Sequence, residues 1–240
     1  MKRFFVLRSG VSSARAGFTL IEMSVVLVLV GLLLGGVLKG QQLIESTRLK
    51  MTISQWEATR TAVSAFEDRF GALPGDFDEA ATFLANGVAD GDGNGVIGTA
   101  GLTMGAAPAA ESGLAWVHLA YGNFLAGVRL GTAADGSDST MPARLSGESL
   151  AIIHGRFGRT AATGHWLRLQ DTLRGPTRAA LSGAQAREID IRYDDGNADS
   201  GYIVMSAPDG ETGTADACKD ADGFYVGGAA GLCNPVLFLQ

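Results

Sequence analysis

The sequence predicts an α+β protein in which a long amino-terminal helix packs on an antiparallel β-sheet head. Two observations lead to this fold class: an apolar run that continues into an amphipathic helical pattern, and short apolar segments between glycine-rich turns after residue 76. The 240 residues suffice for one domain of ordinary size and a membrane segment. We expect a basic segment at 1–17, a membrane helix at 18–39, its amphipathic extension at 40–71 and a globular head at 72–240.

The apolar run is long enough to span a bilayer. From Phe18 to Leu38 the only charged residue is Glu22. As a helix, this run rises by about 31 Å, close to the ~30 Å hydrocarbon core of a membrane. No A-x-A-like site follows before Lys39, which predicts that the helix is retained. Basic residues precede the run and predict a cytoplasmic amino terminus with an extracytoplasmic head: Lys2, Arg3, Arg8 and Arg15.

Glu22 is the anomaly in this helix. A carboxylate within a bilayer costs at least ~2.5 kcal/mol on insertion scales, so Glu22 has either a partner or a place beside the headgroups. The surrounding string GFTLIE, residues 17–22, resembles the cleavage and methylation signature of type IV prepilins and of the related pseudopilins of type II secretion. The resemblance implies that residues 1–17 are a leader peptide. It also implies that a prepilin peptidase cuts between Gly17 and Phe18 and methylates the new amine.

The same resemblance implies a structural function without catalysis. Glu22 would pair with the Phe18 amine of a neighbouring subunit inside a filament, because a buried carboxylate is tolerable when a cation neutralises it. The implied partners are like or related pilin subunits, the prepilin peptidase and an inner-membrane assembly platform. The implied location is a single-pass anchor in the inner membrane with a periplasmic head, followed by a pilus or pseudopilus. Both a type IV pilus and a secretion pseudopilus fit this pattern.

Beyond the membrane segment, apolar residues recur at mostly three- and four-residue intervals, which predicts one apolar helix stripe packed against the head. Its members are Leu49, Ile53, Trp56, Val63, Phe66 and Phe70. Gly71, Pro74 and Gly75 are expected to end the helix. In the head, SLAIIHG, HWLRL, IDIRY, GYIVMS and GFYVGG are predicted strands, and WVHLAYGNFL is either a strand or a short helix. Residues 188–206 are predicted to form the clearest hairpin, with an Asp/Gly/Asn-rich loop.

Two cysteines, Cys218 and Cys233, are the only ones in the chain. The predicted orientation places them in an oxidising compartment, where a disulfide persists. A bridge that closes a loop of this length contributes ~3 kcal/mol in the chain-entropy model. In type IV pilins such a bridge delimits a carboxy-terminal loop, and the resemblance implies the same here. Two unpaired thiols are the alternative.

The segment DGDGNGVIG, residues 90–98, resembles the first half of a calcium loop. Asp90, Asp92 and Asn94 stand at alternate positions, where a sharp turn can direct their oxygens at one ion. The twelfth position of such a loop is Gly101 instead of glutamate, so a complete EF-hand is excluded and a calcium site needs an acid from elsewhere. A solvated Asp/Gly turn is the alternative. No cofactor is required by the predicted function, and calcium is the one candidate.

The composition and the remaining motifs limit the other functions. The net charge of −6 argues against a nucleic-acid partner for the head on its own. His118, His154 and His165 lack metal-ligand spacing and are expected to be packed or at the surface, and no serine stands in a nucleophile motif. Two other classes remain open: a membrane-anchored extracytoplasmic calcium- or ligand-binding protein that is not assembled into filaments, and a membrane-tethered hydrolase that uses the acidic loops.

Overall fold

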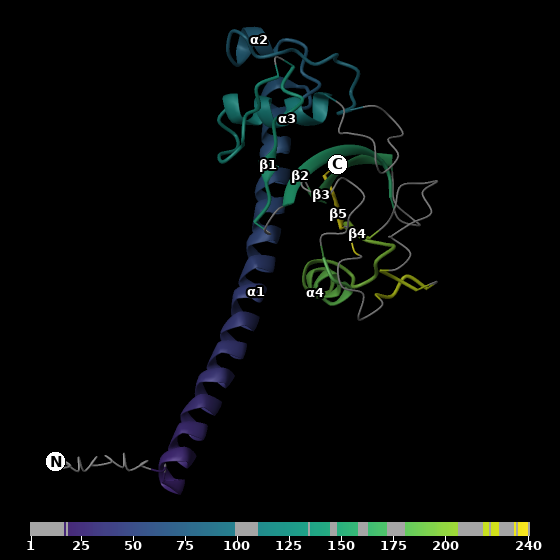
Figure 1. Ribbon diagram of the computed structural model, residues 1–240. Helices are drawn as coiled ribbons and strands as arrows, with labels where there is room; N and C mark the ends of the chain where they lie inside the picture. Colours follow the sequence, from purple (N-terminus) through teal and green to yellow (C-terminus); the bar gives the residue numbers. More distant parts are fainter. Residues whose placement is uncertain are drawn as a thin grey trace, which may run out of the picture. The chain divides into compact units, whose positions relative to one another are not determined.

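A computed structural model describes most of the chain, in eleven stretches (Figure 1). The described residues are 17, 19–98, 110–133, 135–144, 148–157, 163–171, 181–205, 218–220 with 222–225, 233, and 235–239. Contacts within the chain separate two units, Met1–Ser46 and Thr47–Gln240. Each unit is described by itself below.

The longest element is helix α1, Leu20–Phe70, of 51 residues. At ~1.5 Å per residue it is about 77 Å long. Every residue from Leu20 to Leu38 is exposed, although the segment is almost entirely apolar. Among the described residues, α1 is the one helix whose length and composition suit a membrane crossing, and none of its most apolar stretch is buried within the chain. The expected apolar helix is confirmed.

In the second unit, the stripe predicted for the later part of α1 is confirmed. Trp56 and Phe66 have no exposed surface, and Leu49, Ile53 and Val63 are also buried. The Phe66 ring packs at 4.7 Å from Phe70 and 5.9 Å from Phe77, measured between centroids. The helix ends where Gly71 takes a positive φ of 71°, a conformation that glycine adopts without steric cost.

The head contains an antiparallel five-stranded sheet in the order β1-β2-β3-β5-β4 (Figure 1). Its strands are β1 Met141–Pro142, β2 Glu148–Arg156, β3 Thr163–Asp171, β4 Ile203–Val204 and β5 Val236–Phe238. The central pair β2–β3 is the long hairpin of the fold, with register from Glu148 opposite Asp171 to Arg156 opposite Thr163. The predicted α+β architecture with an antiparallel head is therefore correct.

The side chains on the two faces of this sheet belong to two different hydrophobic clusters, because successive strand residues point to opposite faces. Leu150, Ile152 and Leu167 belong to the larger cluster, which also contains the stripe of α1 and the buried residues of α3, Ala110–Tyr121. Ala151 and Ile153 lie in a second cluster on the other face. The ambiguous WVHLAY segment is thus a helix. A shorter helix, α2, covers Ala80–Phe83.

The hairpin predicted at 188–206 is wrong in its first arm. Residues Gly183–Tyr193 form helix α4, and only the second arm is a strand, β4. Ser182 caps the helix: its hydroxyl accepts the Gln185 N–H and the Gln185 side chain accepts the Ser182 N–H, a capping box. The alternating Ile and charged residues fit a strand, but Ala186 and Ile189 are buried at helical spacing while Ile191 is exposed.

Another predicted strand, GFYVGG, is described only in its first half, which contains one bridge. Within GFYVGG, Tyr225 pairs with Lys219, and the residues after Tyr225 in that segment lie outside the described residues. The carboxy-terminal β5 was not predicted, and it inserts between β3 and β4.

The packing of Phe66 generates a stability prediction. Phe66→Ala should lower the free energy of unfolding by about 3–5 kcal/mol, because it removes a fully buried ring and leaves a cavity. Urea denaturation of the full chain in detergent micelles, followed by tryptophan fluorescence, measures the change. Met51→Ala on the same helix is the control, because that side chain is half exposed. Equal small losses for both variants would contradict the assigned core.

Candidate functional site

The amino-terminal site begins at the first turn of α1. Gly17 and Thr19 are described and exposed, whereas Phe18 lies outside the described residues. The Thr19 hydroxyl accepts the Glu22 N–H at 3.2 Å, and the Thr19 carbonyl accepts the Met23 N–H at 3.2 Å. Thr19 therefore acts as the N-cap of α1, and Glu22 stands three residues after it, as in a capping box.

Glu22 is the one acidic residue in this first turn, and its side chain is exposed. A helix amino terminus carries a partial positive charge from its unpaired N–H groups, so it favours a carboxylate there. This effect is worth up to ~1 kcal/mol at an exposed site, less than the cost of placing the charge in lipid. The intrachain environment thus orients Glu22 without neutralising it.

The acidic loop, residues 89–98, forms the second candidate site. Asp92 lies with Asp76 and Glu111, and one carboxylate oxygen from each falls within 4.8 Å of the others. Asp76 is buried and accepts the N–H groups of Asn94 at 2.8 Å and Gly95 at 2.9 Å. Glu111, in the first turn of α3, accepts the Gly98 N–H at 2.7 Å. Three segments that are distant in sequence therefore bring carboxylates together.

The charged forms of these carboxylates are disfavoured by burial and by mutual repulsion. Burial raises the pKa of Asp76, and Asp92 raises it further, although the backbone donors of Gly95 and Asn94 lower it. Burial likewise raises the pKa of Glu111, and Asp92 and Asp76 add to the effect while the Gly98 donor lowers it. A proton or a cation would relieve this repulsion.

The other two residues expected at a calcium site point elsewhere. The Asp90 carboxylate accepts the Ala81 N–H at 2.8 Å. Asn94 donates its side-chain N–H to Asp92 at 2.7 Å, and its side-chain oxygen accepts the Val96 N–H at 2.7 Å. The structure thus groups Asp92 with two acids that the loop pattern does not contain, and it uses Asp90 and Asn94 to shape the turn.

Cys218 and Cys233 form a disulfide, and both are buried. Their Cα atoms are 5.2 Å apart, a normal separation for a bridge. The Cys233 backbone pairs with Leu181 through two hydrogen bonds of 3.0 Å, so the bridge holds residue 218 beside the segment that leads into α4.

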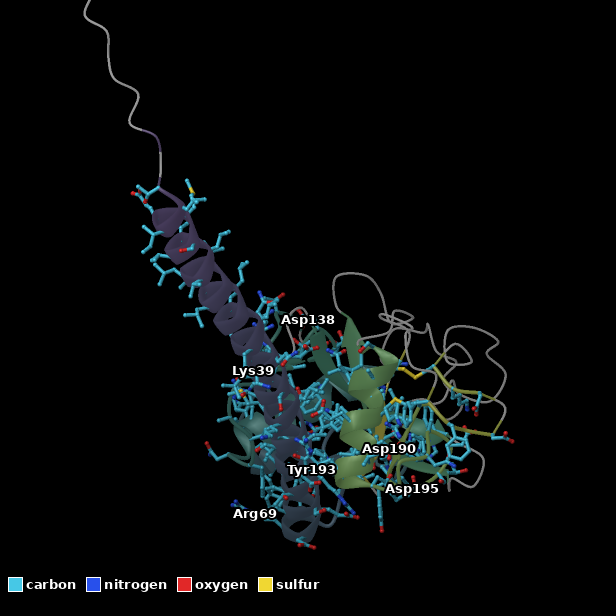
Figure 2. All side chains as sticks on the ribbon, turned by 90° about the horizontal axis from the view of Figure 1, so that it is seen from below. Lys39, Arg69, Asp138, Asp190, Tyr193 and Asp195 are labelled. Carbon is cyan, nitrogen blue, oxygen red and sulfur yellow. A yellow bond between two sulfur atoms is a disulfide. The ribbon has the colours of Figure 1, made fainter. Side chains whose placement is uncertain are left out.

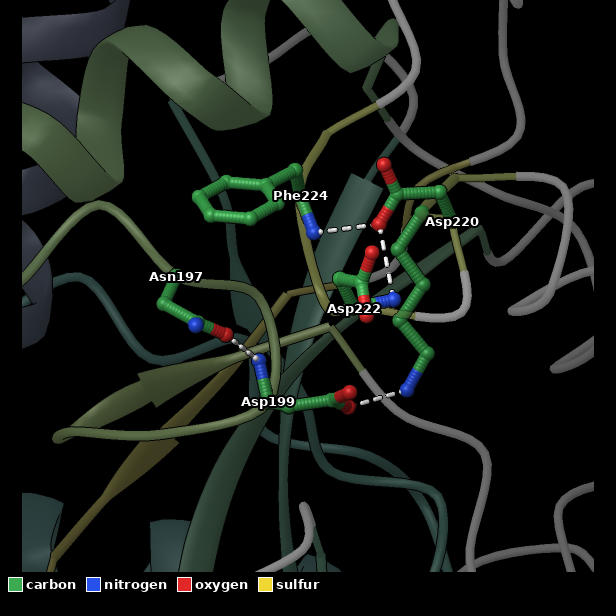
Figure 3. A network of polar contacts seen from close by, with 6 residues as sticks. Asn197, Asp199, Asp220, Asp222 and Phe224 are labelled. Atoms are coloured by element: carbon green, nitrogen blue, oxygen red, sulfur yellow. Dashed lines mark hydrogen bonds and ion pairs between the residues drawn. The ribbon is translucent and has the colours of Figure 1, made fainter.

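A polar network extends from the disulfide (Figure 3). Lys219 forms an ion pair with Asp199, whose N–H donates to the Asn197 side chain at 2.9 Å. The Asp220 carboxylate accepts the N–H groups of Asp222 and Phe224 at 3.0 and 2.8 Å. The ion pair fastens Lys219 to the loop between α4 and β4, and the Asp220 bonds shape the turn at 222–224.

The second acidic group, Asp190, Asp194 and Asp195, lies at the end of α4 (Figure 2). Burial raises the pKa of Asp190 to about 6, while the Tyr225 hydroxyl and the Gly196 N–H donate to its oxygens. Asp194 and Asp195 accept backbone N–H groups of the same loop, from Ile203 and Asn197 respectively. These acids therefore hold the loop between α4 and β4, which replaces the predicted hairpin turn.

Comparison with known families bears on the amino-terminal site. Residues 12–38 match the family model of the prokaryotic N-terminal methylation motif, which spans the Thr19 cap, Glu22 and the exposed apolar part of α1. This match supports a prepilin-type, pilin-like amino-terminal segment. No curated protein and no solved structure matches it. The exposed apolar helix suits a pilin-like protein anchored in a membrane, and pilin-type proteins are in general structural.

Sequence reasoning missed the role of three residues at these two sites. The capping role of Thr19 could have been predicted, because Thr19 and Glu22 have the spacing of a capping box. Asp76 and Glu111 carried no local signal, because they join Asp92 only through the packing of α3 against the turn that follows α1.

The cap of α1 generates a second prediction. Thr19→Val should weaken the first turn by about 1 kcal/mol, because the Glu22 N–H loses its acceptor. Hydrogen exchange of the full chain in micelles should show faster exchange over residues 20–24. Thr61→Val is the matched control, because the Thr61 hydroxyl donates to Glu57 within the middle of α1 and caps nothing. Identical exchange in both variants would argue against the cap.

Proposed function

We propose that this protein is a structural subunit of a type IV pilus or type II secretion pseudopilus, assembled through α1 and catalysing no reaction. The methylation motif at residues 12–38 is the observation that carries this proposal. The exposed apolar surface of Leu20–Leu38 supports it, because such a surface requires lipid or other apolar helices around it.

Processing is the first step of the proposal. The bond between Gly17 and Phe18 precedes α1, which begins at Leu20, so its cleavage would not require unwinding of the helix. A prepilin peptidase would remove residues 1–17 and methylate the Phe18 amine. The resulting chain would carry a positive amine four residues before Glu22.

Assembly is the second step. Within one chain, Glu22 has the helix amino terminus beside it but no cation among the described residues. The amine of Phe18 in a neighbouring copy would supply that cation and offset a cost of at least ~2.5 kcal/mol in lipid. The pairing would set the stagger between adjacent helices, because both groups lie at one end of α1.

The head would lie on the periplasmic side before assembly. The disulfide between Cys218 and Cys233 fits an oxidising compartment. The basic residues before Phe18 fit a cytoplasmic amino terminus. The partners would be like or related pilin subunits, the prepilin peptidase and the inner-membrane assembly platform.

Amino-terminal sequencing with mass spectrometry tests processing. The expected mature chain begins at methylated Phe18. A chain that retains residues 1–17 and works as a monomer would support a membrane-anchored binding protein and would overturn the filament proposal. Deleting the gene and scoring both surface fibres and secreted proteins would then separate a pilus from a pseudopilus.

Glu22→Ala tests assembly. Membrane insertion should be retained, while filament yield should fall at least about tenfold, because the positive end of the neighbouring helix loses its partner. Sheared filaments and membrane fractions are quantified by immunoblot. Glu45→Ala is the control on the same helix, outside the apolar run. Wild-type filament yield with Glu22→Ala would exclude the pairing.

We also propose that the acidic loop binds calcium, with Asp92, Asp76 and Glu111 as carboxylate ligands. The observation in favour is the convergence of three carboxylates, two with raised pKa, within 4.8 Å. Calcium prefers oxygen ligands of this kind, and its charge would remove their repulsion.

Calcium titration of the full chain in micelles tests this proposal. Calcium should raise the melting temperature of the wild type, and Asp92→Asn should abolish the shift, since a carboxylate ligand becomes neutral. Asp135→Asn is the control, because Asp135 lies in an exposed turn with Ser137. No binding heat, together with an unchanged melting temperature in chelator, would refute calcium binding.

A further inference from the structure

Two buried histidines hold the two ends of the acidic loop. His118 comes from α3 and contacts the loop at Ala89, and His165 comes from β3 and contacts it at Ile97. Neither histidine has a role in the pilin-like assembly or in the carboxylate group described above. Both have rings that take part in backbone hydrogen bonds.

His118 bridges two segments. Its Nδ1 accepts the Gly75 N–H at 2.9 Å, so Nε2 is left to donate to the Ala89 carbonyl at 2.9 Å. The ring has no exposed surface and stacks on Phe66, at 6.1 Å between centroids. Both ring nitrogens are therefore used, and the neutral tautomer with the proton on Nε2 is the one that satisfies both bonds.

His165 holds the other end. Its Nε2 accepts the Ile97 N–H at 3.0 Å, and the Ile97 side chain is fully buried. The opposite residue on β2 is His154, whose ring lies 5.0 Å from that of His165. A protonated Nε2 would place two N–H groups against each other, so the Ile97 bond exists only while His165 is neutral there.

We propose that His118 and His165 form a clamp that holds the acidic loop closed at neutral pH, and that acidification releases the Ile97 end held by His165 while His118 keeps the Ala89 end. The Ile97 bond to His165 and the Gly75 bond to His118 each require an unprotonated ring nitrogen as acceptor, whereas His118 donates its bond to Ala89 and keeps it when protonated. Protonation turns that acceptor nitrogen into a donor facing a buried backbone donor, which costs the bond and leaves the amide unsatisfied. Release would occur at Ile97, whose amide has no other acceptor than His165 among the described residues.

The charges around the two rings set the direction of the effect. Burial, together with the smaller effect of His154 on β2, lowers the pKa of His165 to about 4. Burial also lowers the pKa of His118, while its bond to Ala89 and the charge of Asp90 raise it. A histidine whose folded pKa lies below its unfolded value of 6.5 favours the closed loop above pH 6.5. That preference is lost as the pH falls toward 4.

Asp76 and Glu111 act in the opposite direction. Their pKa values are raised by burial, so their protonation on acidification relieves repulsion and favours the closed loop. Their bonds hold Asn94, Gly95 and Gly98, whereas the histidines hold Ala89 and Ile97. Exchange measured at Ile97 therefore isolates the histidine effect from the carboxylate effect.

Hydrogen exchange of the full chain in micelles at pH 7 and pH 4.5, corrected for the intrinsic exchange rate, tests the clamp. The open fraction at Ile97 should rise by about 60-fold between pH 7 and pH 4.5, the ratio that follows from pKa values of 6.5 in the open state and about 4 in the closed state. An unchanged open fraction at Ile97 would overturn the proposal.

Two variants make the test specific. His165→Gln keeps an acceptor at the same distance along the side chain but cannot be protonated, so Ile97 should stay protected at pH 4.5. His154→Gln removes a neighbouring positive charge and should move the loss of protection in an otherwise wild-type chain to higher pH. Equal loss of protection in His165→Gln and the wild type would assign the pH effect to other groups and overturn the clamp.

Discussion

An apolar helix surface that no described part of the chain covers is the constraint on which this structure depends. Helix α1 is continuous from Leu20 to Phe70, yet its two parts meet different requirements. Around Trp56 and Phe66 the helix stripe is buried by the head, and burying such side chains contributes roughly 1.5–3 kcal/mol each. From Leu20 to Leu38 the apolar side chains stay exposed, and only lipid or other helices can cover them.

The head is arranged around α3 as much as around its sheet. Glu111 and His118 lie seven residues apart on one face of this helix, and both contact the backbone around the acidic loop. Between them, Ala115 is fully buried beside Gly75, where φ is 93° and a side chain would collide with the α3 backbone. The close approach of α3 to this glycine brings the carboxylates of Asp76 and Glu111 together and fixes both ends of the loop.

Much of the fold was readable because its signals are local. The β2 and β3 segments, the stripe of α1 and the GFTLIE string each lie within a short window, where periodicity or spacing identifies them. Residues 188–193 were misread as a strand, because isoleucine and charged residues alternate there with a period of two. In the helix that this segment forms, Ile189 and Asp190 are both on the buried side. The capping box from Ser182 to Gln185 was the local signal that distinguishes the two.

The sequence by itself determined that an apolar helix with a carboxylate near its start precedes an antiparallel head, since composition and spacing along one chain carry that information. Tertiary structure alone decided which acids converge on Asp92 and which buried amides face His118 and His165. Those groups come from segments that are far apart in the sequence. The order of residues does not reveal which of these segments lie close together in space. Only the packing of α3 and β3 around the turn after α1 brings them within hydrogen-bond reach.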